Sequence, residues 1–288
     1  MKPIAIAADS GIRGVNMKKS RFSEQGQSEL DYNLEICILA SGSRGNAVYV
    51  SDGSTSILID AGLSGIEIER RLNSQGLYPE GLNAIIVSHE HTDHIQGVGV
   101  LSRRFNLPVY MSSKTEKAAV SKLGTVRVIK NFECGSPFII NDLSIHPFSI
   151  SHDAKDPSGF TVNQNGTKIG IATDLGIATS MVKEHLKGCS LLILEANHDE
   201  DMLINGPYPW PIKQRIKGRT GHLSNEASKN LLKELQHDRL KYVTLAHLSQ
   251  TNNTPQKALS EVSRAITRCN AQLDIATQDE CGALLRLK

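Results

Sequence analysis

The feature that most constrains this chain is a cluster of metal-ligand side chains directly after a short apolar segment. Residues 84–87 read Ala-Ile-Ile-Val, the composition of a buried strand, and the chain continues as Ser-His89-Glu-His91-Thr-Asp93-His94. Histidines two apart in extended backbone project to the same side, so His89 and His91 can share one ion. Asp93 and His94 come where the chain should turn into a helix, and they can face a second ion. The fold must therefore bring a strand end and a helix start around a metal centre.

The donor atoms in this cluster narrow the choice of metal. Imidazole and carboxylate together suit zinc or manganese, with iron as an alternative, and no thiolate is offered. The competing interpretation is a polar loop that carries histidines by coincidence, because motif matches always include some such cases. Four ligand-type residues within six positions, between a predicted strand and a predicted helix, favour the metal site.

Further ligand candidates lie at the ends of later predicted strands. His152 follows the apolar run 146–150, Asp174 follows 169–172, and His247 follows 242–246. Ligands gathered from several strand ends are typical of a rigid scaffold with a site at its rim.

The composition is that of an ordinary globular protein. The 288 residues are 39% hydrophobic and 22% charged, and the formal net charge of +2 means that affinity for nucleic acid would require a local positive patch. No apolar run approaches the roughly 20 residues that span a bilayer, and the N-terminal apolar stretch is too short for a secretory signal. The five scattered cysteines form no Cys-x-x-Cys pair, which argues against a disulfide framework. We therefore expect a protein of the reducing cytoplasm without membrane association.

The apolar pattern predicts one α/β domain over residues 34–288, preceded by a loosely ordered extension over residues 1–33. Two strand-rich halves, each accompanied by helices, predict two packed sheets with helices outside. Helix starts are predicted from capping signals at Ser64, Ser113, Ser224 and Thr254, and another helix is expected over 95–105. The expected strands are residues 34–40, 46–51, 56–60, 84–88, 107–111, 138–146, 168–172, 190–194, 241–247, 272–276 and 282–287.

On these residues the chain resembles the metallo-β-lactamase superfamily across nearly all of residues 34–288. The His-x-His-x-Asp-His motif of that superfamily matches the cluster at 89–94, and its later ligands match His152, Asp174 and His247 in order. The resemblance implies a four-layer αβ/βα sandwich. It also implies that one metal ion is held by His89, His91 and His152, that the other is held by Asp93, His94 and His247, and that Asp174 bridges them.

Two metal ions supply a specific chemistry. Cations about 3.5–4 Å apart can hold a hydroxide between them and clamp the attacking and leaving oxygens of an in-line displacement. Since the pKa of a bound water can fall to roughly 7, a nucleophile exists at neutral pH without any side-chain nucleophile.

Two later segments resemble loops of ribonuclease Z and related phosphodiesterases. Leu-Glu195-Ala-Asn ends a predicted strand, and Gly-His222-Leu-Ser opens a predicted helix. In those enzymes a Glu–His pair, linked to the Asp of the metal motif, handles the proton of the leaving oxygen. The resemblance implies that His222 is a general acid or phosphate contact, that Glu195 orients it, and that Asp93 takes part. The chain has Leu-Glu-Ala-Asn where ribonuclease Z has His-Glu-Ala-Thr, and it lacks that enzyme's long tRNA-binding arm, which argues against tRNA 3′ processing.

A cationic strip separates these two loops. Lys213, Arg215, Lys217 and Arg219 stand at alternate positions and would project from one face of an extended segment that leads to His222. Trp210 lies nearby and can stack on a base. The strip is interpreted equally well as a phosphate-binding track or as a solvated charged face.

The loop Ser41-Gly42-Ser43-Arg44-Gly45-Asn46 completes the pattern. It is neither a nucleophile elbow nor a P-loop, and it can serve simply as a tight turn between strands. Together with Ser-His152-Asp, Ala-Thr-Asp174-Leu-Gly, Asn-Gly-Pro-Tyr-Pro-Trp210 and Gly-His222-Leu-Ser-Asn, however, it resembles the YycJ (WalJ) type of single-domain proteins, which are associated with exonuclease activity on DNA. On that resemblance Ser43 and Asn46 join Trp210 and the four cations as expected substrate contacts.

The sequence thus predicts a dinuclear metal-dependent phosphodiesterase that uses a hydroxide between its metals, with a DNA exonuclease first and RNA as an alternative substrate. A small-molecule hydrolase of the same fold, acting on a cyclic nucleotide, a thioester or a lactam, is the second hypothesis. Such a thioesterase or lactamase would have no use for the Glu195–His222 pair. A degenerate binding module is the third, and the complete set of seven ligands argues against it. The sequence leaves the oligomeric state open.

Overall fold

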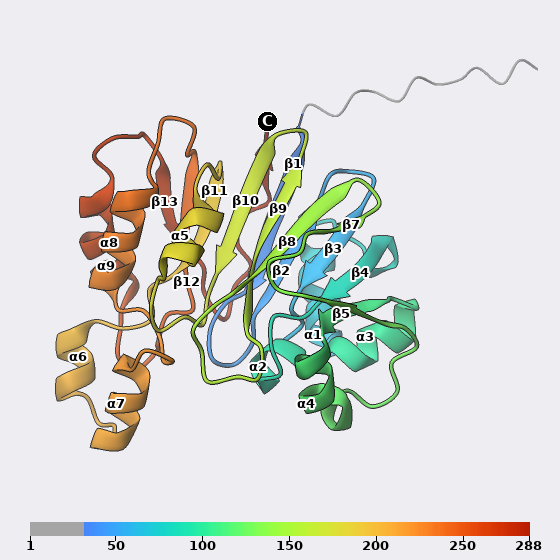
Figure 1. Ribbon diagram of the computed structural model, residues 1–288, viewed down its shortest axis with the longest axis horizontal. Helices are drawn as coiled ribbons and strands as arrows, with labels where there is room; N and C mark the ends of the chain where they lie inside the picture. The colour runs from blue at the N-terminus through green and yellow to red at the C-terminus, as the bar shows by residue number, and fades with distance from the viewer. Residues whose placement is uncertain (1–31) are drawn as a thin grey trace, which may run out of the picture. The chain divides into compact units, whose positions relative to one another are not determined.

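Side chains that alternate between two faces build two mixed sheets in the computed structural model, which describes residues 32–288 (Figure 1). The first sheet has the strand order β14-β1-β2-β3-β4-β5-β6, and the second has the order β13-β12-β11-β10-β9-β8-β7. The first contains β1 (Leu34–Ala40), β2 (Ala47–Ser51), β3 (Ser56–Ile59), β4 (Leu82–Ile86), β5 (Val109–Ser112), β6 (Ile129–Phe132) and β14 (Leu285–Leu287). The second contains β7 (Phe138–Ile140), β8 (Leu143–Ser149), β9 (Ser158–Gln164), β10 (Thr167–Ala172), β11 (Leu191–Glu195), β12 (Tyr242–Ala246) and β13 (Gln272–Ile275).

The strand pleat divides the apolar side chains between a central core and two outer cores. In β1, Ile36 and Ile38 lie in the core between the sheets, whereas Leu39 lies in the outer core of the first sheet. In β11, Ile193 faces the central core, and Leu194 faces the outer core of the second sheet. Strands that are apolar on both faces in this way must be covered on both faces.

Helices supply the outer cover. Ile68, Leu101 and Leu123 of α1, α3 and α4 pack in the outer core of the first sheet, and Val182, Leu232 and Val262 of α5, α8 and α9 pack in that of the second. The two helix groups flank the two sheets in Figure 1. The predicted four-layer αβ/βα sandwich is therefore confirmed. The helices are α1 (Gly65–Ser74), α2 (Thr92–Ile95), α3 (Val98–Phe105), α4 (Ser113–Leu123), α5 (Ser180–Leu186), α6 (Glu200–Asn205), α7 (Trp210–Lys217), α8 (Asn225–Leu235) and α9 (Pro255–Val262), with short 3-10 turns at Pro79–Gly81 and Ser263–Ala265.

Three of the four predicted helix caps are confirmed. Ser64, Ser224 and Thr254 each accept a hydrogen bond from the backbone N–H three residues later. The fourth cap is Ser112, which accepts from Thr115 N, and the prediction of Ser113 is wrong by one residue. The predicted helix over 95–105 divides into α2 and α3.

One strand prediction was wrong, and two strands were missed. The expected strand 138–146 is a hairpin, because Asn141 adopts a left-handed conformation (φ 50°) and reverses the chain between β7 and β8. The strand β9 was missed, although Asn165 and Gly166 after it also have positive φ and form the turn into β10. Asn-Gly and Asn-Asp pairs favour such turns and were the available signals. The short edge strand β6 was missed as well.

The expectation of a loosely ordered extension over 1–33 lies outside the described residues except at its end. There, Asn33 donates to Leu287 O at 2.7 Å and to Thr167 Oγ1 at 2.9 Å, and Tyr32 lies under the Arg286 guanidinium. The described residues 32–288 belong to one compact unit. None of the helices in residues 32–288 is long and apolar enough to cross a bilayer.

Parallel strand pairing decides where the polar loops meet. β10, β11 and β12 are mutually parallel neighbours, so the residues after them emerge at one edge of the second sheet. β3 and β4 are likewise parallel, so the residues after both emerge at one edge of the first sheet. These loops carry every ligand candidate of the sequence except His152, which follows β8.

Candidate active site

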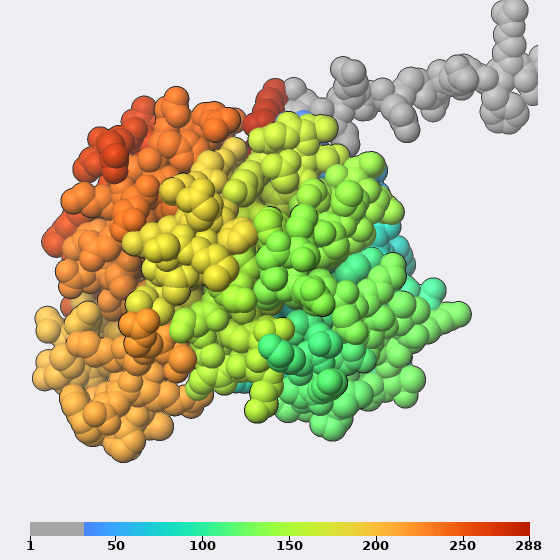
Figure 2. All heavy atoms as spheres, viewed as in Figure 1, coloured from blue at the N-terminus to red at the C-terminus, as the bar shows by residue number. Residues whose placement is uncertain are grey.

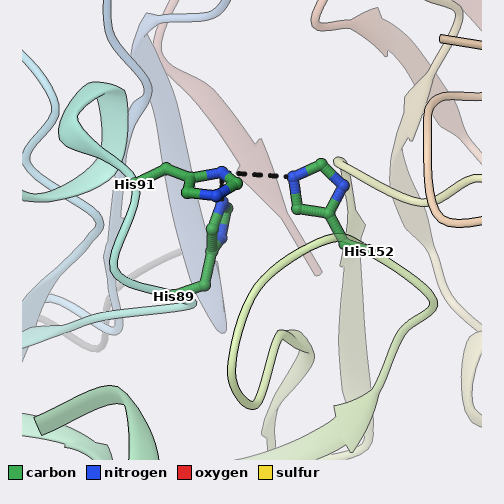
Figure 3. A group of neighbouring side chains, drawn as sticks. All are labelled: His89, His91 and His152. Atoms are coloured by element: carbon green, nitrogen blue, oxygen red, sulfur yellow. Dashed lines mark hydrogen bonds between the residues drawn. The ribbon is translucent and has the colours of Figure 1, made fainter. Parts of the chain in front are cut away.

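Three imidazoles converge at the first cluster (Figure 3). His89 Nε2 lies 3.1 Å from His91 Nδ1, which lies 3.3 Å from His152 Nε2. Two ligands at 2.0–2.1 Å from a tetrahedral zinc ion would be about 3.3–3.4 Å apart. The three nitrogens are thus spaced as ligands of one ion, and His89 and His91 approach from the same side, as their spacing predicts.

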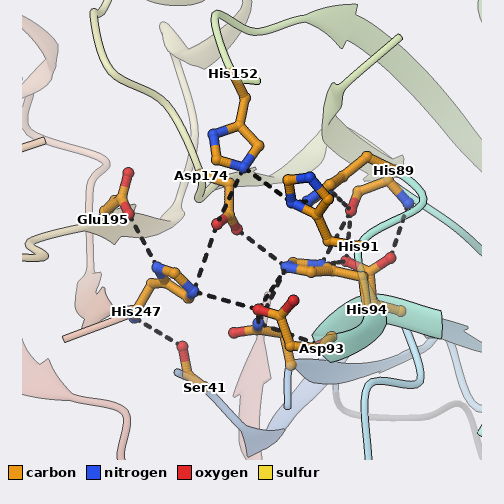
Figure 4. A network of polar contacts seen from close by, with 12 residues as sticks. Ser41, His89, His91, Asp93, His94, His152, Asp174, Glu195 and His247 are labelled. Atoms are coloured by element: carbon orange, nitrogen blue, oxygen red, sulfur yellow. Dashed lines mark hydrogen bonds and ion pairs between the residues drawn. The ribbon is translucent and has the colours of Figure 1, made fainter. Parts of the chain in front are cut away.

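A second cluster of carboxylates and imidazoles adjoins the first (Figure 4). Asp174 lies at its centre, with Oδ2 3.3 Å from His94 Nε2 and Oδ1 3.4 Å from His247 Nε2. Asp93 Oδ2 is 3.5 Å from His94 Nε2 and 3.8 Å from His247 Nε2. Asp174 Oδ1 also lies 3.9 Å from His152 Nε2 of the first cluster. The structure therefore brings all seven predicted ligands together, with Asp174 between the two clusters.

Contacts on the outer ring nitrogens orient the imidazoles. His89 Nδ1 lies 2.9 Å from Ser88 Oγ, and His152 Nδ1 lies 3.3 Å from the carbonyl oxygen of Gly221. His247 Nδ1 lies 3.0 Å from Glu195 Oε1. Such contacts fix the tautomer and turn the other nitrogen toward the shared centre.

Asp60 is the orienting residue that sequence reasoning missed. Its Oδ2 lies 2.7 Å from His94 Nδ1, and its Oδ1 accepts a hydrogen bond from Ser88 N at 2.8 Å. It follows β3 directly, in Ile59-Asp60-Ala61, just as Asp174 follows an apolar strand. A carboxylate directly after a buried strand was the signal that could have identified it.

Backbone strain is concentrated at these strand ends. Asp60, Asp174 and His247 have φ values of 59°, 57° and 56°, in the left-handed region. The other described non-glycine residues with positive φ are all asparagines, which adopt this conformation most easily. Each strained residue costs about 1–3 kcal/mol and persists only where the surroundings impose it, most often at functional sites.

The two clusters differ in their electrostatics. Burial lowers the pKa of His89 well below its usual range and also lowers that of His152, which keeps both imidazoles neutral, with lone pairs available. Burial alone would lower the pKa of His247 too, but the surrounding carboxylates, Asp174 foremost, raise it to about 10. The second cluster therefore has an excess of negative charge that a proton or a metal cation can balance.

Two orphaned atoms test whether metal ions fit. Asp174 Oδ2 and His247 Nε2 are buried and have no hydrogen-bond partner among the described residues. Buried polar atoms in native proteins are nearly always satisfied. These two atoms face the same centre, and their donor types are those that divalent ions bind, so the residues present fit a metal pair.

Glu195 joins the ligands to His222. Its Oε1 lies 2.7 Å from His222 Nδ1 and 3.0 Å from His247 Nδ1, and its Oε2 accepts from Leu175 N. Burial tends to lower the pKa of His222, but Glu195 raises it above the usual value. His222 lies 3.8 Å from Asp174 Oδ1 and retains 21% of its side-chain exposure. It is therefore the partly exposed member of a buried pair beside the ligands.

The loop at 41–46 contains the expected substrate contacts Ser43 and Asn46, which differ in exposure. Asn46 is buried; its Nδ2 donates to Gly42 O at 3.1 Å and lies 3.1 Å from His94 Nε2. Ser43 is exposed on the turn. Ser41, which was not predicted, accepts a hydrogen bond from His247 N at 2.8 Å.

The prediction of an extended cationic strip was wrong, because residues 210–217 form helix α7. Pro209 and Pro211 at its start fix the backbone angle that begins a helix, and this outweighs the alternating charges. Lys213 and Lys217 now share one face of the helix with Trp210, which is 62% exposed. Arg215 lies on another side, where its guanidinium pairs with Asp153 at 2.6 Å. Arg219 follows the helix, and its carbonyl oxygen accepts from Ser151 Oγ.

Helix α7 nevertheless lies at the site. His222 N donates to Ile216 O at 2.9 Å, so the end of α7 fixes the backbone of the His222 loop. Asp153 Oδ1 lies 3.4 Å from His152 Nε2, so the Arg215–Asp153 ion pair connects α7 to the first ligand cluster. In the surface view α6 and α7 form a lobe at one end of the molecule (Figure 2).

Comparison with known proteins identifies the class. A family model described as a β-lactamase superfamily domain matches residues 55–244, and the chain belongs to this superfamily. Exodeoxyribonuclease YycJ of Bacillus anthracis is 37% identical over 235 residues, which make up 81% of this chain and 89% of that protein. The resemblance predicted from the ligand motif and the loop motifs is confirmed.

Solved structures agree on the fold. The metallo-β-lactamase fold protein YhfI from Bacillus subtilis aligns with a TM-score of 0.68 at 17% identity, covering 86% of this chain and 98% of that one. Zn(2+)-bound PqqB from Methylobacterium extorquens aligns with a TM-score of 0.60 at 17% identity, covering 88% and 100%. The fold and the clustered ligand atoms together imply divalent metal ions in this protein.

Substitution of Asp60 tests its orienting role. Asp60→Asn keeps the shape but removes the charge that holds His94 Nδ1–H, so affinity for the more weakly bound ion should fall roughly 10–100-fold. Competition with a chromogenic zinc chelator measures this. Asp238→Asn, at a side chain that is 95% exposed, is the matched control and should bind as the wild type does. Equal affinity in both variants would remove Asp60 from the site.

Proposed function

We propose that this protein is a dinuclear metal-dependent phosphodiesterase that acts as a DNA exonuclease in the cytoplasm. The observation that carries the proposal is the Glu195–His222 pair, which adjoins Asp174 but completes neither predicted ligand set. A proton-handling pair beside two metal sites is suited to a leaving oxygen that must be protonated, as in phosphodiester hydrolysis. The 37% identity to an exodeoxyribonuclease over most of both chains supports DNA as the substrate.

The ligand assignment follows the two clusters. His89, His91 and His152 would hold one ion, Asp93, His94 and His247 the other, and Asp174 both; zinc or manganese suits these donors, with iron as an alternative. When bound, the ions would supply Lewis acidity, which withdraws electron density from a phosphodiester and lowers the pKa of water so that hydroxide is available as the nucleophile near neutral pH. The cytoplasmic location is supported by five free cysteines.

The side chains of this protein supply the proton. Glu195 holds His222 through Nδ1, which directs Nε2 away from the carboxylate and leaves it to donate to the leaving oxygen. Glu195 also contacts His247, so one buried carboxylate orients both the proton donor and a ligand. Asp93, which is 23% exposed, lies at the open side of the second cluster and completes the catalytic set.

Removal of the shared carboxylate tests the metal centre and the activity together. Asp174→Ala should lower the metal content and abolish degradation of end-labelled DNA, because both clusters lose a ligand. Elemental analysis and a nuclease assay on single- and double-stranded DNA measure the two effects. A variant that retained two ions and a near-wild-type rate would contradict the ligand assignment.

Removal of the proton donor should separate chemistry from metal binding. His222→Ala should keep the full metal content while the rate falls roughly 10²–10⁴-fold, the usual effect of a lost general acid. His222 also lies within reach of a cluster formed by Asp174, Glu195 and His247. Loss of one ion in the variant would therefore make His222 a ligand and overturn its assigned role.

The four cations around α7 are proposed to bind the phosphates of the strand, together with Trp210 as a base-stacking surface. Arg215 and Lys217 are paired with Asp153 and Glu200, so a phosphate must compete with these carboxylates. The side chains of Arg215 and Lys217 are 66% and 53% exposed and those of their partners 30% and 41%, and ion pairs this open to solvent contribute little stability. An incoming strand with several phosphates can therefore displace them.

Salt dependence tests this proposal. Replacement of Lys213 and Arg215 by Gln should flatten the log–log slope of DNA affinity against salt by roughly 1 to 1.5, since each phosphate contact on a single strand contributes about 0.7. Lys183→Gln on α5 with Lys187→Gln directly after it removes the same charge elsewhere and should leave the slope unchanged. Equal slopes in the two double variants would make the α7 cations a solvated face and favour a small-molecule substrate.

A further inference from the structure

A pocket of 410 Å³ lies on the other side of Ser41 from the metal ligands. Ser41 lines this pocket while its Oγ accepts the hydrogen bond from His247 N, and Leu248, the next residue, forms part of the wall. Figure 4 shows Ser41 directly beside His247. The pocket is therefore adjacent to His247, because Leu248 follows His247 in the chain and Ser41 is hydrogen-bonded to it.

The lining of the pocket combines apolar surface with neutral hydrogen-bonding groups. Leu248, Pro255 and Ile275 supply apolar contacts, and Gln250 and Gln256 supply exposed amides. Among the described residues that line it there is no lysine, arginine or histidine, and its one carboxylate, Asp279, is paired with Arg44. Such a lining suits a flat, uncharged group with donors and acceptors at its edge, and it does not suit a phosphate.

One buried group in the lining lacks a partner. Gln278 is 8% exposed, and its Oε1 accepts a hydrogen bond from Arg44 N at 2.9 Å, which fixes the amide. Its Nε2 is buried and has no acceptor among the described residues. A buried donor left unpaired costs free energy, so binding of a ligand whose acceptor reached Nε2 would be favoured.

We propose that this pocket binds one nucleobase of the DNA strand while the adjoining phosphodiester lies at the metal ligands. A volume of 410 Å³ is at the lower end of ligand pockets and is sufficient for a single nucleoside. A base edge offers carbonyl and ring-nitrogen acceptors and amino donors, which the exposed amides of Gln250 and Gln256 can pair with. The enzyme therefore selects an unpaired nucleotide at the cleavage position. This inference rests on the proposed phosphodiesterase function.

Single abasic nucleotides test the pocket. In a series of end-labelled single-stranded oligonucleotides, one abasic nucleotide is moved stepwise from either end. For the wild type, kcat/KM should fall roughly tenfold at one position next to the cleaved bond, as expected for one lost base contact. The double variant Gln250→Ala, Gln256→Ala should show a lower kcat/KM on intact DNA and a clearly reduced penalty for that abasic position. Gln278→Met, which removes the donor at similar volume, should act in the same direction.

Two controls make the outcome decisive. Gln272→Ala changes an exposed glutamine at the other end of β13, and it should keep the full abasic penalty. Metal content and thermal unfolding of each variant check that the fold is intact. An unchanged penalty in folded Gln250→Ala, Gln256→Ala and Gln278→Met proteins would overturn the pocket assignment.

The wild type separates this inference from the proposed function. If the wild type cleaved DNA and no abasic position lowered kcat/KM, only the pocket assignment would be overturned. Cleavage of bis(p-nitrophenyl) phosphate but of no DNA would overturn the nuclease proposal and the pocket assignment with it. A free deoxynucleoside should inhibit cleavage of an intact strand by competing for the pocket. Loss of this inhibition in the double variant would support a base-binding pocket independently of strand position.

Discussion

The contact of Asp174 with His94 and His247 is the interaction on which the rest of this structure depends. It joins the loop after β4 in the first sheet to the loops after β10 and β12 in the second. The carboxylate is fully buried among imidazoles, and such a group is stable only when its charge is balanced. A cation at this point would complete the coordination and also hold the two sheets together at this edge.

The surrounding contacts show how the scaffold sustains such a centre. Asp60 and Glu195 each act on the outer nitrogen of an imidazole, so a carboxylate backs both His94 and His247. The left-handed backbone at Asp60, Asp174 and His247 turns these side chains inward immediately after a strand ends. Strain of this kind is offset by packing in the three apolar cores, which is why the ligands follow rigid strands.

Regions of different chemistry lie next to one another at this edge of the sheets. The candidate metal ligands form a carboxylate-rich centre that suits cations, whereas α7 presents the cations Lys213 and Lys217 beside Trp210. The pocket beyond Ser41 is neutral and is lined by amides. Three neighbouring regions therefore differ in chemistry. The metal-ligand cluster suits the reacting phosphodiester, the cations of α7 suit the other phosphates, and the pocket suits a base. The hairpin of α6 and α7 connects two of these regions, because it ends at the His222 loop.

By itself, the sequence determined the fold class and the set of candidate metal ligands that the structure brings together. His89 and His91 follow from a two-residue period, the caps at Ser64 and Ser224 follow from local hydrogen bonding, and the sheets follow from apolar runs, all of which are short-range effects. Only the tertiary structure decided the pairing of Asp60 with His94, of Arg215 with Asp153 and of Ser41 with His247, because these partners are 34, 62 and 206 residues apart. Residues 210–217 became a helix rather than a strand because the prolines at its start outweigh a charge alternation that both conformations tolerate. Contacts over such separations depend on the parallel order of strands, and no local pattern in the chain encodes that order.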